Sequence, residues 1–166
     1  MALDSTVVVA ANTFLDLLGS APELCFYEAL REEAAAVFQK ESDWENPAVL
    51  ARLTRIDSAL RESLRRNPQA VRSRQREIVH RDGLTLPDGH HLPRGSWVGF
   101  PVAGVHFDER FYPDPVTYDP FRFISSITEP KPGSTFTDIG SRPQKYLSMG
   151  VTSNTFLSFG HGHHSW

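Results

Sequence analysis

The sequence predicts a mainly α-helical chain with a small antiparallel β-sheet, an α+β fold, in a single domain of 166 residues. Apolar side chains recur at helical spacing up to Pro68. Most of the prolines and glycines follow Pro68, and Pro87-Asp88-Gly89 has the residue types of a hairpin turn. Helices are therefore expected first, then the sheet, then extended coil.

Three helices are predicted before Pro68. Residues 6–18 are almost wholly apolar, which is typical of a helix buried inside a larger protein. Residues 22–38 carry apolar side chains at helical spacing behind a proline at the first turn. Residues 48–66 form the third helix, which ends before Pro68 because the residue preceding a proline avoids the helical region.

Short strands are predicted beyond the third helix. Residues 71–79 form one strand, residues 84–86 lead into the hairpin turn, and residues 96–100 form another strand. From Pro101 onward, prolines divide the chain into short coil segments. Residues 125–151 are polar and lack periodicity, which predicts a mobile loop.

Composition excludes several kinds of partner. The formal net charge of −3 offers no basic surface for nucleic acid or an anionic membrane. The single cysteine, Cys25, allows no disulfide within the chain, and we interpret it as a packing residue of the second helix. No apolar run approaches the roughly 20 residues that cross a bilayer. The sequence is therefore expected to be soluble.

Glu62 and Arg65 lie three residues apart on the third predicted helix, so their side chains are neighbours. By spacing alone they face away from the apolar stripe of that helix and form a surface ion pair worth at most about 1 kcal/mol. By the same reasoning, Asp4 and Ser5 cap the start of the first helix.

Two glycines and three histidines lie close together at the end of the sequence, in Phe159-Gly160-His161-Gly162-His163-His164-Ser165-Trp166. Glycine permits backbone conformations that other residues resist. Neutral imidazoles are good metal ligands, so His161, His163 and His164 could bind a metal, or the run could be a tail rich in histidine by chance.

The order of these motifs resembles cytochromes P450, the haem-thiolate monooxygenases. The family carries E-x-x-R, then P-x-R-F, then F-G-x-G-x-(H/R)-x-C-x-G. The corresponding residues here are Glu62-Ser63-Leu64-Arg65, Pro120-Phe121-Arg122-Phe123 and the run from Phe159 to Ser165. The sequence around residues 84–95 and 107–115 is similar to filamentous-fungal members, and Ala2-Leu3-Asp4-Ser5 resembles a motif of the family's long central helix.

The resemblance implies a partial cytochrome P450 fold. Residues 1–66 would be the end of the central helix and the two following helices. Residues 67–123 would be the β-sheet and coil region, residues 124–158 a variable loop, and residues 159–166 the start of the haem-binding loop. The N-terminal helices and the helix after the haem loop are expected to be missing.

The resemblance also implies roles for individual residues. Glu62 and Arg65 would face inward and join Arg122 in a buried ion-pair network. Asp4 and Ser5 would relay protons to bound dioxygen. Those implied for cofactor binding are Phe159, Gly160 and Gly162 in the haem loop, His164 at a haem propionate, and either Arg72 or Arg74 at a propionate.

The cofactor implied by the resemblance is haem, and the partners are an NADPH-dependent reductase and a small organic substrate, with no nucleic acid. Full-length members are expected in the endoplasmic reticulum membrane, and this chain, without an anchor, in the cytoplasm. One departure matters for activity. Trp166 occupies the position of the ligand cysteine, and an indole nitrogen only donates hydrogen bonds.

Three hypotheses follow from that departure. In the first, the chain is a C-terminal fragment of a monooxygenase that is inactive because the iron ligand is absent. In the second, it is a non-catalytic remnant that binds metal or haem through His161, His163 and His164. In the third, the chain does not fold stably alone, because its first helix is too apolar to face water.

Overall fold

The computed structural model describes residues 2–68, 73–124, 148–160 and 162, with the side chains of residues 2–4 and 73–74 left out. Its helices, including two 3₁₀ turns, are α1 (Ala2–Leu18), η1 (Pro22–Leu24), α2 (Phe26–Val37), η2 (Glu41–Glu45), α3 (Pro47–Leu50), α4 (Thr54–Arg66) and α5 (Val102–His106). Its strands are β1 (Ser73–Glu77), β2 (Leu84–Thr85), β3 (His91–Leu92) and β4 (Trp97–Phe100). The predicted α+β class, helical first and β-stranded later, is confirmed.

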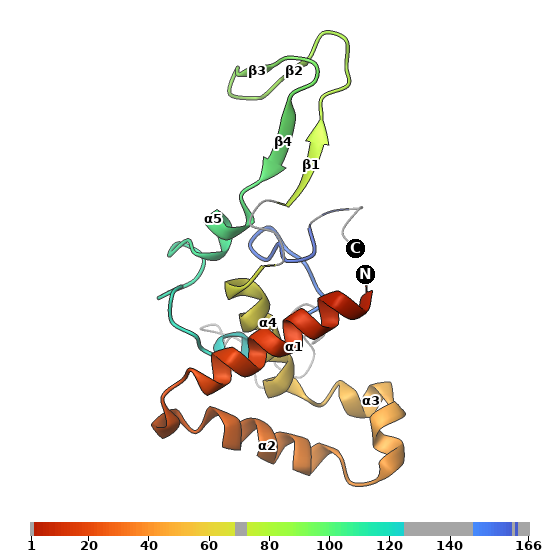
Figure 1. Ribbon diagram of the computed structural model, residues 1–166, viewed down its shortest axis with the longest axis vertical. Coiled ribbons are helices and arrows are strands. Elements are labelled where there is room, and N and C mark those ends of the chain that lie inside the picture. Colours follow the sequence, from red (N-terminus) through yellow and green to blue (C-terminus); the bar gives the residue numbers. More distant parts are fainter. Residues whose placement is uncertain (1, 69–72, 125–147, 161, 163–166) are drawn as a thin grey trace, which may run out of the picture.

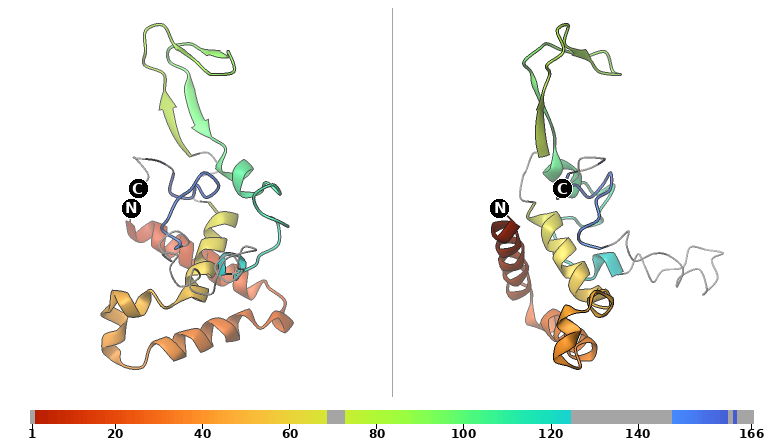
Figure 2. Two further views of the ribbon diagram at one scale, coloured as in Figure 1. Left: turned by 180° about the vertical axis from the view of Figure 1, so that it is seen from behind. Right: turned by 90° about the vertical axis from the view of Figure 1, so that its right-hand side faces the viewer.

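The helices form a body from which the strands extend as an arm (Figure 1). Helix α4 lies in the middle of the body. Helix α1 lies on one side of α4 and the segment 148–160 on the other, as the right-hand view of Figure 2 shows. Because α4 is covered by α1 on one side and by residues 148–160 on the other, seven of its residues are buried, including Arg61, Glu62 and Arg65. Its position makes α4 the scaffold to which the rest of the described chain is attached.

The prediction of one helix over residues 48–66 is wrong, because α3 and α4 are separate. Leu53 has a ψ of 63°, outside the helical range, and α4 begins at Thr54. The Glu33 carboxylate of α2 accepts hydrogen bonds from the backbone N–H groups of Arg55 at 2.8 Å and Ile56 at 2.9 Å. A carboxylate satisfies the unpaired N–H groups of a helix start and is favoured by the helix dipole. Glu33 therefore stabilises a new helix start where the apolar periodicity alone predicts continuity.

The second predicted helix also begins later than expected. Residues 22–24 form the 3₁₀ turn η1, and Cys25 follows with a φ of 50°, in the left-handed region. Cys25 is exposed, and its thiol contacts the Glu23 carbonyl at 3.7 Å. The interpretation of Cys25 as a packing residue is therefore wrong. Its backbone makes the bend between η1 and α2.

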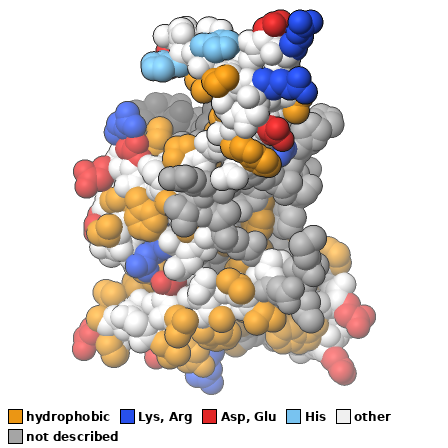
Figure 3. Space-filling model, turned by 45° about the horizontal axis from the view of Figure 1, so that its top comes forward, with side chains coloured by type: hydrophobic (Ala, Val, Ile, Leu, Met, Phe, Trp, Pro, Cys, Tyr) orange, Lys and Arg blue, Asp and Glu red, His pale blue; other side chains and the backbone are white. Residues whose placement is uncertain are grey.

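The arm consists of two antiparallel ladders. In the first, β1 pairs with β4, with Glu77 opposite Trp97 and a bulge between Ser73 and Arg76. In the second, Leu84 of β2 lies opposite Leu92 of β3. The hairpin turn between β2 and β3 is confirmed, with Gly89 at a φ of 89°. His80, His90 and His91 of this arm are exposed, and pale-blue histidine atoms appear at the top of the view in Figure 3.

Helix α5 was not predicted, because five residues between prolines are too few to show helical periodicity. Val102 and His106, one turn apart, are buried. The core joins α4 and α5 to the coil that follows α5 and to the segment 148–160. Its most buried hydrophobic side chains are Ala59, Leu64, Val102 and Phe156.

Helix α1 presents apolar side chains to solvent. Phe14 is 62% exposed, Leu15 67% and Leu18 80%. The expectation that this helix is buried therefore does not hold within these residues. Because α1 begins at Ala2, Asp4 and Ser5 lie inside the helix, and the prediction of a cap is wrong. Among the described residues, no single helix has the length and hydropathy to cross a membrane; Ser5–Leu18 and Pro22–Val37 meet those criteria only as a pair bent by 100°.

Candidate functional site

Glu62 and Arg65 form a fully buried ion pair near the C-terminal end of α4. Arg65 Nε donates to Glu62 Oε2 at 2.8 Å, and Arg65 Nη2 donates to Glu62 Oε1 at 2.7 Å. Both side chains have 0% exposure. The surface ion pair that spacing alone predicts is therefore wrong, because further chain covers this face of the helix. The inward orientation agrees with the family resemblance.

Arg122 contributes a second positive charge to the same carboxylate. Its Nε donates to Glu62 Oε1 at 3.1 Å, and its Nη1 donates to the carbonyl oxygen of Pro113 at 2.6 Å. Arg65 reaches the same coil, since its Nη2 donates to the Pro115 carbonyl at 2.8 Å. The cluster therefore ties α4 to the coil of residues 113–122 through both charge and backbone contacts.

Arg61 and Asp57, one and two turns before Arg65 on α4, hold the segment that begins at Ser148. Arg61 Nη1 donates to the carbonyl oxygens of Ser148 at 2.5 Å and Val151 at 3.0 Å. The Asp57 carboxylate accepts from the Met149 N–H at 3.1 Å. Burial is the largest influence on both groups, raising the pKa of Asp57 and lowering the pKa of Arg61.

The Arg61 guanidinium also lies against aromatic rings. It is 3.9 Å from the ring centre of Phe156 and 4.8 Å from that of Phe123. Such close cation–π contacts compensate part of the cost of removing the charge from water. Within the described part of the chain, Arg61 Nε is buried without a hydrogen-bond partner. Sequence reasoning missed Asp57 and Arg61, although their four-residue spacing on a helix was a usable signal.

His106 joins three segments. Its Nδ1 lies 3.0 Å from the carbonyl oxygen of Arg65, and the Leu157 N–H donates to its Nε2 at 2.8 Å. The ring stacks on Phe156, with 5.4 Å between the ring centres. Burial lowers the pKa of His106 to about 4, because desolvation disfavours the charged imidazole. Sequence reasoning did not identify His106, since a lone histidine between prolines carries no spacing signal.

Residues 155–160 lead into the predicted loop and are fixed by further contacts. Tyr112 Oη donates to the Thr155 carbonyl at 2.8 Å, and Ser158 Oγ donates to the Leu64 carbonyl at 3.1 Å. Gly160 and Gly162 have φ values of 85° and 79°, in the region that favours glycine. A Cβ atom at Gly162 would meet nothing within 4 Å. The backbone there is therefore open on one side.

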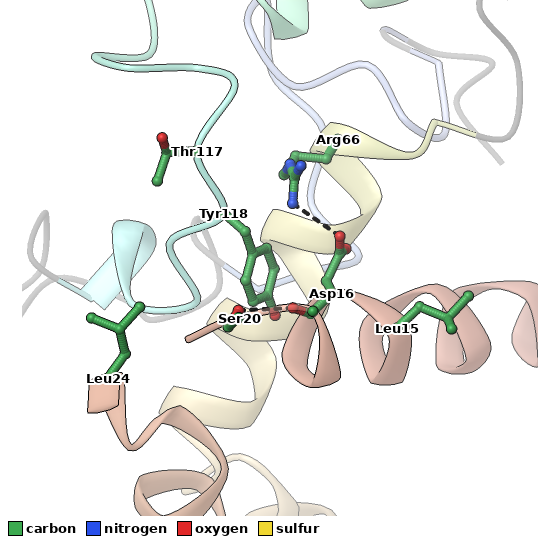
Figure 4. Close-up of a pocket in the computed structure, with 8 residues that line it drawn as sticks. Leu15, Asp16, Ser20, Leu24, Arg66, Thr117 and Tyr118 are labelled. Carbon is green, nitrogen blue, oxygen red and sulfur yellow. Dashed lines mark hydrogen bonds and ion pairs between the residues drawn. The ribbon is translucent and has the colours of Figure 1, made fainter. Parts of the chain in front are cut away.

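A second cluster attaches α1 to the opposite face of α4 and borders a cavity of about 340 Å³ (Figure 4). The Asp16 carboxylate accepts from Arg66 Nη1 at 2.9 Å and from Ser63 Oγ at 2.5 Å. Tyr118 lines the same cavity, and its burial raises the pKa of its phenol. Asp16 already has three side-chain partners, counting Asn67 at 3.0 Å, so the cluster holds helices together and leaves little capacity for a ligand.

The remaining predicted site residues fall into two groups. Ser5 on α1 and Phe159 before Gly160 are described, and both are partly exposed. Those outside the described residues or side chains are Asp4, Arg72, Arg74, His161, His163, His164 and Trp166. In the described part of the chain, no group of three or more histidine, cysteine, aspartate or glutamate side chains could hold a metal ion.

Comparison with known proteins gives a consistent result. The family model "Cytochrome P450" matches residues 3–165. Cytochrome P450 monooxygenase nodZ of Hypoxylon pulicicidum is 39% identical over 92% of this chain and 30% of the relative. Cytochrome P450 monooxygenase polB of Polytolypa hystricis is 37% identical over 99% of this chain and 30% of the relative. The chain therefore spans about a third or less of the length of these relatives.

The fold comparison agrees. The structure of cyanobacterial CYP120A1 with retinoic acid bound matches 95% of this chain and 30% of its own, with a TM-score of 0.58 and 25% sequence identity. The likeness covers helices, arm and coil together. It confirms the prediction of a partial fold of this type.

Proposed function

Because the chain belongs to the cytochrome P450 family, we propose that these residues form the support of the haem-binding loop of a monooxygenase. One observation carries the proposal: two segments of the chain are attached to α4. Glu62 of α4 binds Arg122 in the coil of residues 113–122. The segment 148–158 is bound by Arg61 of α4 and, through His106, by the Arg65 carbonyl. For the longer proteins that the chain matches in part, we propose the family reaction. Haem, when bound, activates dioxygen so that one oxygen atom enters an organic substrate, with electrons from an NADPH-dependent reductase.

The described residues fit the support of a haem better than the ligation of its iron. Gly160 and Gly162 adopt left-handed backbone conformations, and the open side of Gly162 would allow a flat group to approach the backbone closely. The side chains that could ligate the iron do not fit in the same way. The one cysteine of the sequence, Cys25, lies exposed in the bend before α2 and not on this loop. The described residues therefore provide no thiolate for the iron.

The remaining family roles are proposals of the same kind. Ser5, on the first turns of α1, would pass protons toward the reaction site together with Asp4. His164 would bind a haem propionate, and Arg72 or Arg74 another. The longer protein would reside at the endoplasmic reticulum membrane. Support for these roles comes from the matched motifs and the family, not from contacts of the residues themselves.

We also propose that these 166 residues alone do not form the thiolate-ligated enzyme, because Trp166 offers only an indole N–H. The test is to mix the chain with haem, reduce it and add carbon monoxide. We expect no strongly red-shifted Soret band of the kind that a thiolate ligand produces. The appearance of that band would contradict this part of the proposal.

The supporting role is tested separately, by hydrogen exchange of the backbone amides in residues 113–122 and 148–158. Glu62→Gln removes the charge that holds Arg65 and Arg122, and we expect faster exchange across the coil and this segment. Glu77→Gln changes an exposed carboxylate on β1 and serves as the matched control. Equal exchange in both variants would show that the Glu62 cluster does not support the loop.

A further inference from the structure

His106 satisfies two buried backbone groups at once, on segments far apart in the sequence. The Arg65 carbonyl lies at the end of α4, and the Leu157 N–H lies three residues before Gly160. The side chain has no exposed surface. Buried backbone groups without partners are costly, so this imidazole does more than fill space.

The chemistry of the two partners determines the form of the ring. A carbonyl oxygen only accepts hydrogen bonds, so Nδ1 must carry the hydrogen that points to Arg65. An amide N–H only donates, so Nε2 must be unprotonated to accept from Leu157. The ring is therefore neutral and in the Nδ1–H tautomer. Neither the opposite tautomer nor the imidazolium can make both bonds.

The surroundings favour the same form. Arg61 and Arg65 from α4 oppose a positive charge on the ring, whereas Glu62 favours one. Tyr112, from the coil after α5, faces the ring edge with 6.5 Å between the ring centres. The segment 155–158 brings no ionisable side chain to it. Desolvation is the largest effect, and together with the arginine charges it outweighs Glu62 and the hydrogen bond to the Arg65 carbonyl, so the imidazole is uncharged at neutral pH.

We propose that His106, as the neutral Nδ1–H tautomer, is a positioning residue of the haem-binding loop, which it holds at a fixed separation from α4. That this loop binds haem rests on the proposed function above, whereas the two hydrogen bonds of His106 do not depend on it. The Glu62 cluster contacts the coil of residues 113–122, and Arg61 contacts residues 148–151. His106 instead binds the backbone of Leu157, close to the point where the loop begins.

Two variants separate the two bonds. In His106→Asn, the side-chain amide can still donate to the Arg65 carbonyl but is too short to reach Leu157. In His106→Gln, the amide oxygen extends to the place of Nε2 and can accept from Leu157. We expect the Leu157 amide to exchange at least about tenfold faster in His106→Asn, since a buried N–H loses its acceptor. In His106→Gln it should return to within about threefold of the unchanged chain, with the amides of α4 equal in both variants.

A spectroscopic measurement on the unchanged chain tests the tautomer directly and does not depend on the variants folding. Nitrogen-15 shifts of the His106 ring at pH 7 should show a protonated Nδ1 and an unprotonated Nε2. A protonated Nε2, or an unaltered Leu157 exchange rate in His106→Asn with α4 intact, would overturn the proposal. Neither readout involves haem, so failure of the haem experiment leaves this result unaffected, and the reverse holds as well.

Discussion

Acidification should destabilise this chain through His106. Burial lowers the pKa of His106 from its ordinary value of 6.5 to about 4. The hydrogen bond to the Arg65 carbonyl and the charge of Glu62 oppose this shift, whereas the charges of Arg65 and Arg61 add to it. Between those two pH values the unfolded chain binds a proton at this residue that the folded chain does not. Stability therefore falls as the pH drops below about 6.5, and the loss is complete below about 4.

The magnitude follows from the two pKa values. Each pKa unit corresponds to about 1.4 kcal/mol, so the difference between 6.5 and about 4 amounts to roughly 3 kcal/mol. An ordinary domain has an unfolding free energy of about 5–15 kcal/mol, so this loss would be roughly a third of the total stability. Burial is the main cause of this shift. Protonation would also break the bond from Leu157, because a protonated Nε2 can no longer accept a hydrogen bond.

Urea unfolding followed by circular dichroism, at several pH values between 7.5 and 4, measures this effect. Burial raises the pKa of Asp57, and this group favours the folded state as the pH falls, so its effect must be separated from that of His106. His106→Gln removes only the imidazole, so the difference between the two chains isolates its contribution. We expect the unchanged chain to lose roughly 3 kcal/mol relative to His106→Gln between pH 7.5 and 4. Parallel curves for the two chains would refute the reasoning.

Three further predictions concern α4 and its partners. Glu62→Gln places an amide N–H against Arg65 Nε and removes the counter-charge of the buried Arg65 and the partly buried Arg122. The unfolding free energy should therefore fall by about 3–5 kcal/mol, against less than about 0.5 kcal/mol for Glu77→Gln. Arg61→Leu keeps apolar contact with Phe156 but removes the donors to the Ser148 and Val151 carbonyls, so proteolytic cleavage near residues 148–151 should accelerate while the far-ultraviolet spectrum is retained. Glu33→Gln should lower the free energy of unfolding in urea by about 1 kcal/mol, because it weakens the cap of α4. Glu32→Gln changes the exposed neighbouring carboxylate, and an equal or larger loss in that variant would count against the cap.

The helical half of the fold was predictable because apolar residues at helical spacing are a local signal. The break between α3 and α4 was not, because the carboxylate that caps α4 comes from Glu33 on another helix. The hairpin between β2 and β3 was predictable from its turn residues, since Pro, Asp and Gly act within four positions. Helix α5 was too short to produce a pattern of its own.

The same division applies to the site. Motif order identifies Glu62, Arg65 and Arg122 as members of one family pattern, whereas helix periodicity alone places the first two at the surface. Periodicity shows which residues share a face and not what covers that face. The covering chain here comes from residues 113–122 and 148–158, which lie far from α4 in sequence.

By itself, the sequence determined the order of helices and strands, the family to which the motifs belong, and the presence of a single cysteine away from the haem-loop run. These properties depend on neighbouring residues or on residue identity. Only the tertiary structure decided that the ion pair of α4 is buried, that Asp57 and Arg61 hold the returning chain, and that His106 connects Arg65 to Leu157. Those contacts join residues separated by 41 to 92 positions, and no local pattern in a sequence records which distant segment packs against a given helix face.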